Sequence, residues 1–250
     1  MRMKHNLVLF SLVTVGITAA SHMAFAANVT PTKSNSDFIA GSGIPSDNFL
    51  IDTAGTGESV ALKGRSRDTG EPLSFSGSTF EVKNGNSVLS PSNPWWSFDF
   101  QFSPGTAGMA AEDYVMTLEV DFDPAIGSTD FAVISLPVAD ADSDPTNSWD
   151  DTDGFFTNPG GGGWSDDNVP FVYSQSWNQG FTFWTLPPFN KTYDPNATGE
   201  YSLVLSIAKS SDPMNAIATS SAVVRVVPEP CAGLLLLFGC LGLLINRNAG

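Results

Sequence analysis

The sequence Trp-Ser-Phe-Asp-Phe-Gln-Phe at residues 96–102 alternates aromatic and polar side chains without a break. Residues 114–122, Tyr-Val-Met-Thr-Leu-Glu-Val-Asp-Phe, place larger apolar side chains at every second position in the same way. Because successive side chains of a β-strand point to opposite faces of the sheet, this period of two predicts strands with one buried face.

Weaker runs of the same kind recur along the chain, separated by clusters of Gly, Pro, Asn and Asp that are typical of turns. They lie at residues 59–63, 73–83, 131–138, 170–176, 181–186, 201–209 and 222–227. Between the two ends of the chain no sustained amphipathic helix pattern occurs, although residues 107–113 have room for one or two helical turns. The pattern predicts an all-β fold, a single β-sandwich, and leaves immunoglobulin-like and jelly-roll topologies both open.

The N-terminus has the three parts of a secretory signal peptide. Basic residues Arg2 and Lys4 precede an apolar run at 7–20, and small residues follow at Ala24 and Ala26, the two positions that signal peptidase reads. We expect signal peptidase to cleave after Ala26, with the next residue as the alternative, and the protein to be exported through the inner membrane. The expected organisation is a signal peptide at 1–26, a polar leader at 27–58, the sandwich domain at 59–225 and a C-terminal segment at 226–250.

The C-terminal segment begins with Val227-Pro228-Glu229-Pro230 and continues as an apolar run of about fifteen residues, roughly 22 Å long as a helix. Each proline fixes φ, removes an amide donor and favours an extended conformation in the residue before it. Glu229 is therefore expected to lie in an extended stretch that a processing enzyme can take into its cleft. Arg247, after the apolar run, is consistent with a cytoplasmic end.

This C-terminal segment resembles the PEP-CTERM sorting signal of Gram-negative bacteria: Pro-Glu-Pro, an apolar helix and a basic residue follow one another in the same order. The resemblance implies processing by an exosortase-like membrane enzyme, a transient membrane anchor, and delivery to the cell surface or the extracellular polysaccharide matrix. The family usually ends in a cluster of arginines, whereas Arg247 stands alone here. An ordinary C-terminal anchor or a buried apolar helix is the alternative, but neither accounts for Pro-Glu-Pro. Residues 199–227 also resemble the hairpin that often precedes this signal.

The inventory of reactive side chains argues against an enzyme. Both histidines, His5 and His22, fall in the signal peptide, and both cysteines, Cys231 and Cys240, fall in the C-terminal segment. The remaining domain therefore has no histidine base, no thiol nucleophile and no soft metal ligands. A glycosidase with two carboxylates is the remaining catalytic class, and no acidic pair stands out from the others. The formal charge of −15 makes nucleic acid a poor partner.

One acidic stretch, residues 138–170, lacks strand alternation. Asp140, Asp142 and Asp144 have the Asp-x-Asp-x-Asp spacing that directs carboxylates at a Ca²⁺ ion, and Asp151 stands at the twelfth position, where an EF-hand has glutamate. Pro145 replaces the glycine that an EF-hand needs at its sixth position, so a looser Ca²⁺ site is the metal hypothesis. A solvated acidic loop is the other interpretation.

Tryptophans gather in or beside this acidic stretch, at Trp149, Trp164, Trp177 and Trp184. Exposed rings of this kind can stack on sugars, and the first three are the candidate carbohydrate residues, with exopolysaccharide as the ligand; burial in the core is the alternative. The leading functional prediction is a non-catalytic surface or matrix protein associated with exopolysaccharide or biofilm. The alternative is a calcium-assisted carbohydrate-binding module of the matrix.

Overall fold

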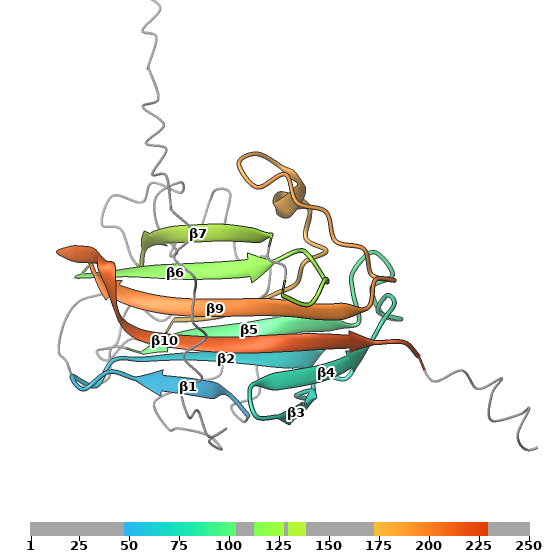
Figure 1. The fold of residues 1–250 in the computed structure, drawn as a ribbon, viewed down its shortest axis with the longest axis horizontal. Helices are drawn as coiled ribbons and strands as arrows, with labels where there is room; N and C mark the ends of the chain where they lie inside the picture. The colour runs from blue at the N-terminus through green and yellow to red at the C-terminus, as the bar shows by residue number, and fades with distance from the viewer. Residues whose placement is uncertain (1–47, 104–112, 128–129, 139–172, 230–250) are drawn as a thin grey trace, which may run out of the picture.

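The structure is a computed structural model that describes residues 48–103, 113–127, 130–138 and 173–229. These residues form two β-sheets with one short 3₁₀ helix, and they contain no α-helix. The prediction of an all-β fold is confirmed. The sheets face each other and share one apolar core (Figure 1).

The smaller sheet has four strands in the order β1-β2-β5-β8, each antiparallel to its neighbour. The strands are β1 (Leu50–Thr53), β2 (Ser59–Ser66), β5 (Trp96–Ser103) and β8 (Tyr173–Trp177). The aromatic stretch singled out in the sequence is thus β5, a central strand of this sheet.

The larger sheet has six strands in the order β3-β4-β10-β9-β6-β7. The strands are β3 (Ser74–Ser76), β4 (Thr79–Lys83), β10 (Asp212–Val227), β9 (Gly199–Lys209), β6 (Tyr114–Asp121) and β7 (Phe131–Pro137). Strands β9 and β10 lie side by side across the molecule as an antiparallel hairpin, which confirms the hairpin expected at 199–227 (Figure 1). On its other edge β10 pairs in parallel with β4, a contact between segments far apart in the sequence.

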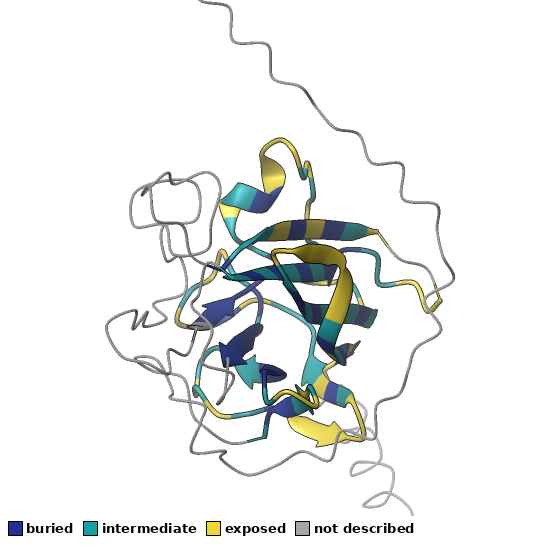
Figure 2. Ribbon diagram, turned by 90° about the vertical axis from the view of Figure 1, so that its left-hand side faces the viewer, coloured by how far each residue is buried: buried dark blue, intermediate teal, exposed yellow. Residues whose placement is uncertain are grey.

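The period of two produces the core. Alternate residues of β6 and β9 are fully buried, and Figure 2 shows the same alternation as bands of dark blue between lighter residues. From the smaller sheet, Phe98, Phe100 and Phe102 complete the core with exposed fractions of 0%. Gly64 on β2 allows the sheets to approach, because a Cβ atom there would lie 3.0 Å from Leu73 and 3.1 Å from Phe80.

Four expectations differ from the structure. The leader predicted at 27–58 contains β1, which pairs with β2 through the register Leu50↔Leu62, so the folded domain begins before residue 59. The run at 73–83 is two strands joined by a turn, β3 and β4. The run at 222–227 is the end of a much longer strand, so the domain also extends past 225. Residues 107–112 lie outside the described residues.

The fourth difference is the run at 181–186, which forms the 3₁₀ helix η2 (Thr182–Thr185) instead of a strand. Its backbone makes the short-range bonds of tight turns, from Trp184 N to Phe181 O at 3.2 Å and from Leu186 N to Phe183 O at 3.1 Å. From this turn Phe181, Phe183 and Trp184 all pack against the core, so the prediction of a strand is wrong.

Candidate functional site

The predicted sorting motif, Val227-Pro228-Glu229-Pro230, begins at the last residue of a strand of the larger sheet. Val227 is the last residue of β10 and lies in register with Lys83 of the parallel strand β4. The backbone amide of Asn84 donates a hydrogen bond to the Val227 carbonyl at 2.8 Å. Pro228 and Glu229 therefore leave the folded domain with no linker between the sheet and the motif.

Glu229 contacts the end of β4 through both its side chain and its backbone. Lys83 Nζ lies 2.6 Å from Glu229 Oε1, and the Glu229 amide donates to Asn84 Oδ1 at 3.2 Å. The Lys83 and Glu229 side chains are 38% and 57% exposed, so water screens the ion pair. An approaching molecule can reach the Glu229 carboxylate directly from solvent.

The residues that contact Glu229 are themselves positioned. Lys83 Nζ lies 3.5 Å from the centroid of the Trp95 ring, a cation–π contact. Asn84 Nδ2 donates to the Asn196 carbonyl at 3.1 Å, and the Gly85 amide donates to the Pro195 carbonyl at 2.6 Å. This end of β4 is therefore tied to the loop that leads into β9.

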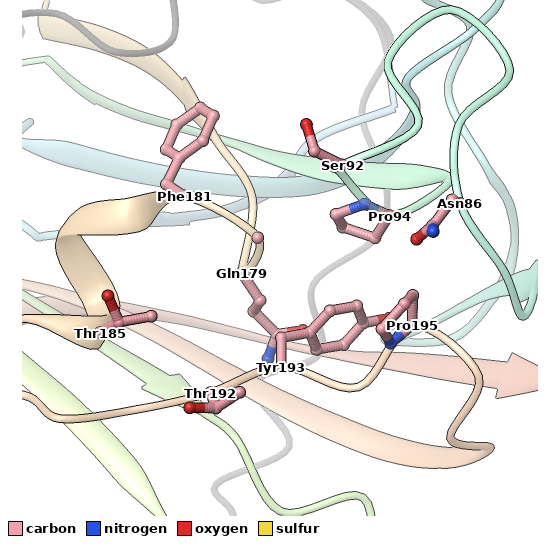
Figure 3. A pocket seen from close by; sticks show the side chains of 10 residues that line it. Asn86, Ser92, Pro94, Gln179, Phe181, Thr185, Thr192, Tyr193 and Pro195 are labelled. Carbon is pink, nitrogen blue, oxygen red and sulfur yellow. The ribbon is translucent and has the colours of Figure 1, made fainter.

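A small open pocket of about 120 Å³ adjoins this region (Figure 3). Its lining is neutral and includes the Tyr193 ring, with Asn86, Gln179 and Thr192 among the polar side chains. Burial raises the pKa of Tyr193 to about 12. The hydrogen bond that Trp96 Nε1 donates to the Tyr193 hydroxyl at 3.0 Å acts in the opposite direction but is the smaller effect. The pocket therefore presents neutral hydrogen-bonding groups and an aromatic ring.

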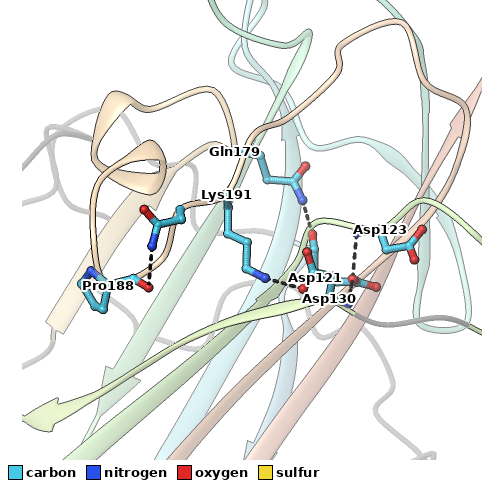
Figure 4. A network of polar contacts seen from close by, with 7 residues as sticks. Asp121, Asp123, Asp130, Gln179, Pro188 and Lys191 are labelled. Atoms are coloured by element: carbon cyan, nitrogen blue, oxygen red, sulfur yellow. Dashed lines mark hydrogen bonds and ion pairs between the residues drawn. The ribbon is translucent and has the colours of Figure 1, made fainter. Parts of the chain in front are cut away.

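An acidic network connects the β6–β7 turn to the segment after η2 (Figure 4). Asp121 Oδ1 accepts the amides of Asp123 at 3.0 Å and Asp130 at 2.8 Å, and Lys191 pairs with the Asp130 carboxylate. Gln179 donates its side-chain amide to the Asp121 carbonyl. Asp121 and Asp130 are therefore engaged in holding the turn.

The metal hypothesis rested on Asp140, Asp142, Asp144 and Asp151, which all lie outside the described residues. In the ranges that the structure does describe, no group of three or more His, Cys, Asp and Glu side chains is arranged to hold a metal ion. The calcium site thus stays a prediction about the acidic segment.

The structure corrects the set of candidate sugar-binding tryptophans. Trp177 is 1% exposed and packs edge-on against Phe100, with ring centroids 5.0 Å apart, and against Trp184 at 5.9 Å. It cannot stack on a sugar, because its ring fills the space between β8 and η2. Trp184 is also buried, at 0%. Trp149 and Trp164 lie outside the described residues.

The polar residues of β5 are buried as well, so both faces of this strand are buried, whereas its alternation predicts one buried face. Asp99 is 0% exposed and lies 3.7 Å from Lys63 Nζ and 3.3 Å from Arg65 Nε. Burial raises the pKa of the Asp99 carboxyl, while the two neighbouring cations act to lower it. The three residues form a charge cluster on the face of the smaller sheet that is turned away from the shared core.

The sequence predicts the Pro-Glu-Pro motif but gives no sign of Lys83 and Asn84, which contact Glu229 in the structure. Lys83 and Glu229 are 146 residues apart, and Lys83 ends a run that was predicted only as a strand. No local pattern marks this contact, because it depends on the parallel pairing of β4 with β10. Pro230 and Arg247 of the motif, like Ala24 and Ala26 of the predicted cleavage site, lie outside the described residues.

By its fold the chain is an all-β protein of two packed sheets. No protein-family model matches the chain, and no curated protein matches it. Among the described residues no helix is both long and apolar enough to span a membrane.

Proposed function

We propose that the protein is an exported, non-catalytic component of the cell surface or extracellular matrix of a Gram-negative bacterium. In this proposal signal peptidase removes residues 1–26, and an exosortase-like membrane enzyme acts at Pro228-Glu229-Pro230 after a transient anchorage by the apolar run. The observation that carries the proposal is the order of Pro-Glu-Pro, apolar run and Arg247 at the C-terminus.

The position of the motif supports this proposal. The last strand ends at Val227, and Glu229 is 57% exposed beyond it. An enzyme at the membrane can therefore reach Glu229 while the domain stays folded. The proposed role is structural, in association with exopolysaccharide or biofilm. For the fold we propose a β-sandwich of immunoglobulin-like or jelly-roll topology.

A second candidate function is a calcium-assisted carbohydrate-binding module. The neutral pocket beside Tyr193 favours it, because sugar hydroxyls pair with amide and hydroxyl side chains while a sugar face lies on an aromatic ring. Trp149 and Trp164 remain as candidate stacking residues, with Ca²⁺ held by the acidic segment. Binding of the purified protein to the host polysaccharide on a glycan array tests this candidate, and failure to bind rejects it.

The sorting proposal is tested with Glu229→Ala expressed in a host that has the processing system. We expect this variant to remain full-length and in the membrane fraction, because its motif lacks the carboxylate that the enzyme recognises. Glu81→Ala on β4, a second exposed glutamate of the same sheet, is the matched control and should be processed like the wild type. Equal processing of Glu229→Ala and the wild type would reject the proposal.

A further inference from the structure

We propose that the folded domain carries a docking site for its own sorting motif, formed by Lys83 and Asn84 at the end of β4, and that the processing enzyme must displace Glu229 from it. The inference rests on the proposed sorting function. It adds that the domain, through a contact far away in the sequence, lowers the rate at which the motif is processed.

Three hydrogen bonds define the docked state. The Asn84 amide donates to the Val227 carbonyl at 2.8 Å, which extends the parallel ladder to the edge of the motif. Beyond the ladder, Asn84 Oδ1 accepts the Glu229 amide at 3.2 Å, and Lys83 Nζ donates to Glu229 Oε1 at 2.6 Å. The backbone amide and one carboxylate oxygen of Glu229, both of which an enzyme cleft would have to engage, therefore already have partners in the folded domain.

The docking site is held in place by neighbours other than Glu229. The ring of Trp95 lies 3.5 Å from Lys83 Nζ, and the carbonyl of Asn196 accepts a hydrogen bond from Asn84. A lysine that is confined in this way loses less conformational freedom on pairing than a lysine that is free in solvent. These contacts favour a site that keeps its shape when Glu229 leaves.

The charge of the chain makes this site distinctive. The sequence has 26 acidic residues against 11 basic ones, so at one cation per carboxylate fewer than half of the carboxylates can form an ion pair. Lys83 supplies a cation at the point where the motif leaves the sheet. An enzyme that recognises the Glu229 carboxylate through its own cation therefore competes with Lys83 for the same group.

The expected size of the effect follows from the exposure of the pair. Exposed ion pairs change an equilibrium by about 1.5- to 5-fold. When only the undocked fraction binds the enzyme, the apparent KM rises by the inverse of that fraction and kcat is unchanged. Removing the docking contact is therefore expected to accelerate processing by about 1.5- to 5-fold at low substrate concentration.

The test is a pulse–chase measurement of full-length protein in the processing host. Lys83→Met removes the charge and keeps an unbranched stem against Trp95, and Asn84→Ala removes the acceptor for the Glu229 backbone amide. Both variants should be processed faster than the wild type, by about 1.5- to 5-fold. Arg225→Met is the matched control, because it removes a cation and breaks an exposed ion pair of the same sheet, Arg225 with Glu200 at 2.7 Å, and Arg225, two residues before Val227, does not belong to the docking site. Its rate should equal that of the wild type.

A second measurement reports docking without the enzyme. Hydrogen exchange of the Glu229 backbone amide, followed by mass spectrometry in the detergent-solubilised full chain, should be faster in Lys83→Met and Asn84→Ala than in the wild type. Unchanged exchange in both variants would overturn the docking inference.

The outcomes separate the two proposals. If the wild type is processed and neither variant is faster, the docking inference is wrong and the sorting proposal stands. If neither the wild type nor Glu229→Ala is processed, the sorting proposal fails, and with it the effect on processing. In that case the exchange measurement alone decides whether the contact exists in solution.

Discussion

Replacing Trp177 by alanine should strongly destabilise the domain, because the ring links β8 to η2 in the core. Its indole is 1% exposed and meets Phe100, Phe183 and Trp184 at centroid distances of 5.0, 5.2 and 5.9 Å. A buried aromatic side chain removes about 150–250 Å² from water, which corresponds to about 4–6 kcal/mol at 25 cal/mol per Å².

Partial collapse of the cavity lowers that figure, and truncations of buried tryptophan to alanine cost about 3–5 kcal/mol. For a domain of this size each kcal/mol corresponds to about 2–4 °C in Tm, so we expect a drop of about 6–20 °C. Thermal unfolding followed by circular dichroism measures it. Leu186→Ala is the control, because Leu186 directly follows η2 and is 46% exposed; its change should stay near 0.5 kcal/mol.

The contrary result would be a Trp177→Ala protein that melts within about 2 °C of the wild type. Such a result together with a loss of binding to the host polysaccharide would mean that the Trp177 ring faces solvent. The described packing of β8 against η2 would then be wrong.

Three further predictions test other parts of the molecule. Gly199→Ala should lower Tm, because Gly199 has φ +150° and a Cβ atom there would lie 2.0 Å from the Pro124 carbonyl oxygen. Gly55 has open space around it, so Gly55→Ala should leave Tm unchanged. Equal Tm values for the two variants would contradict the packing described at Gly199. Burial acts to raise the pKa of Glu58, but its hydrogen bonds from Thr56 and Tyr114 lower that pKa overall, so the unfolded state binds the proton more tightly. Its contribution to stability is therefore complete above about pH 4.5 and lost as pH falls through the folded pKa, and Glu58→Gln should show a shallower fall in Tm between about pH 5 and 3 than the wild type; parallel curves would refute this role. Ca²⁺ at about 1–10 mM should raise Tm by a few degrees in the wild type, and Mg²⁺ should raise it less. The Asp140→Ala, Asp142→Ala, Asp144→Ala triple variant should show no such rise with Ca²⁺. Equal shifts with both cations would indicate screening of an acidic surface.

The sequence was most informative where strands are long and alternate strictly. Residues 96–102 and 114–122 correspond to β5 and β6, because neither strand has a polar residue on its core-facing side. The sequence gives no prediction of the short strand β1, because the four residues Leu50–Thr53 are too few to show a repeating alternation. The strand is defined by its pairing with β2. The sequence predicts a strand in place of η2 because Phe181 and Phe183 flank the polar Thr182, and so short an alternation also occurs in a tight turn.

Contacts between distant segments explain the remaining differences. The polar set of β5 has a strand pattern typical of a solvent-facing side, yet Asp99 is buried beside Lys63 of the neighbouring strand. Likewise, Glu229 is a candidate from Pro-Glu-Pro alone, whereas its contact with Lys83 depends on the parallel register Val227↔Lys83. Local patterns report periodicity and motif order, and they carry no information on which strands become neighbours.

The central claim is that Pro228-Glu229-Pro230 directs processing of an exported protein. Mass spectrometry of the protein released from the cell surface of its native host, with identification of both terminal peptides, tests this claim most directly. We predict an N-terminus at Ala27 and a C-terminus close to the Pro-Glu-Pro motif, with the apolar run absent. Surface protein that mostly retains the C-terminal Gly250 would contradict the claim.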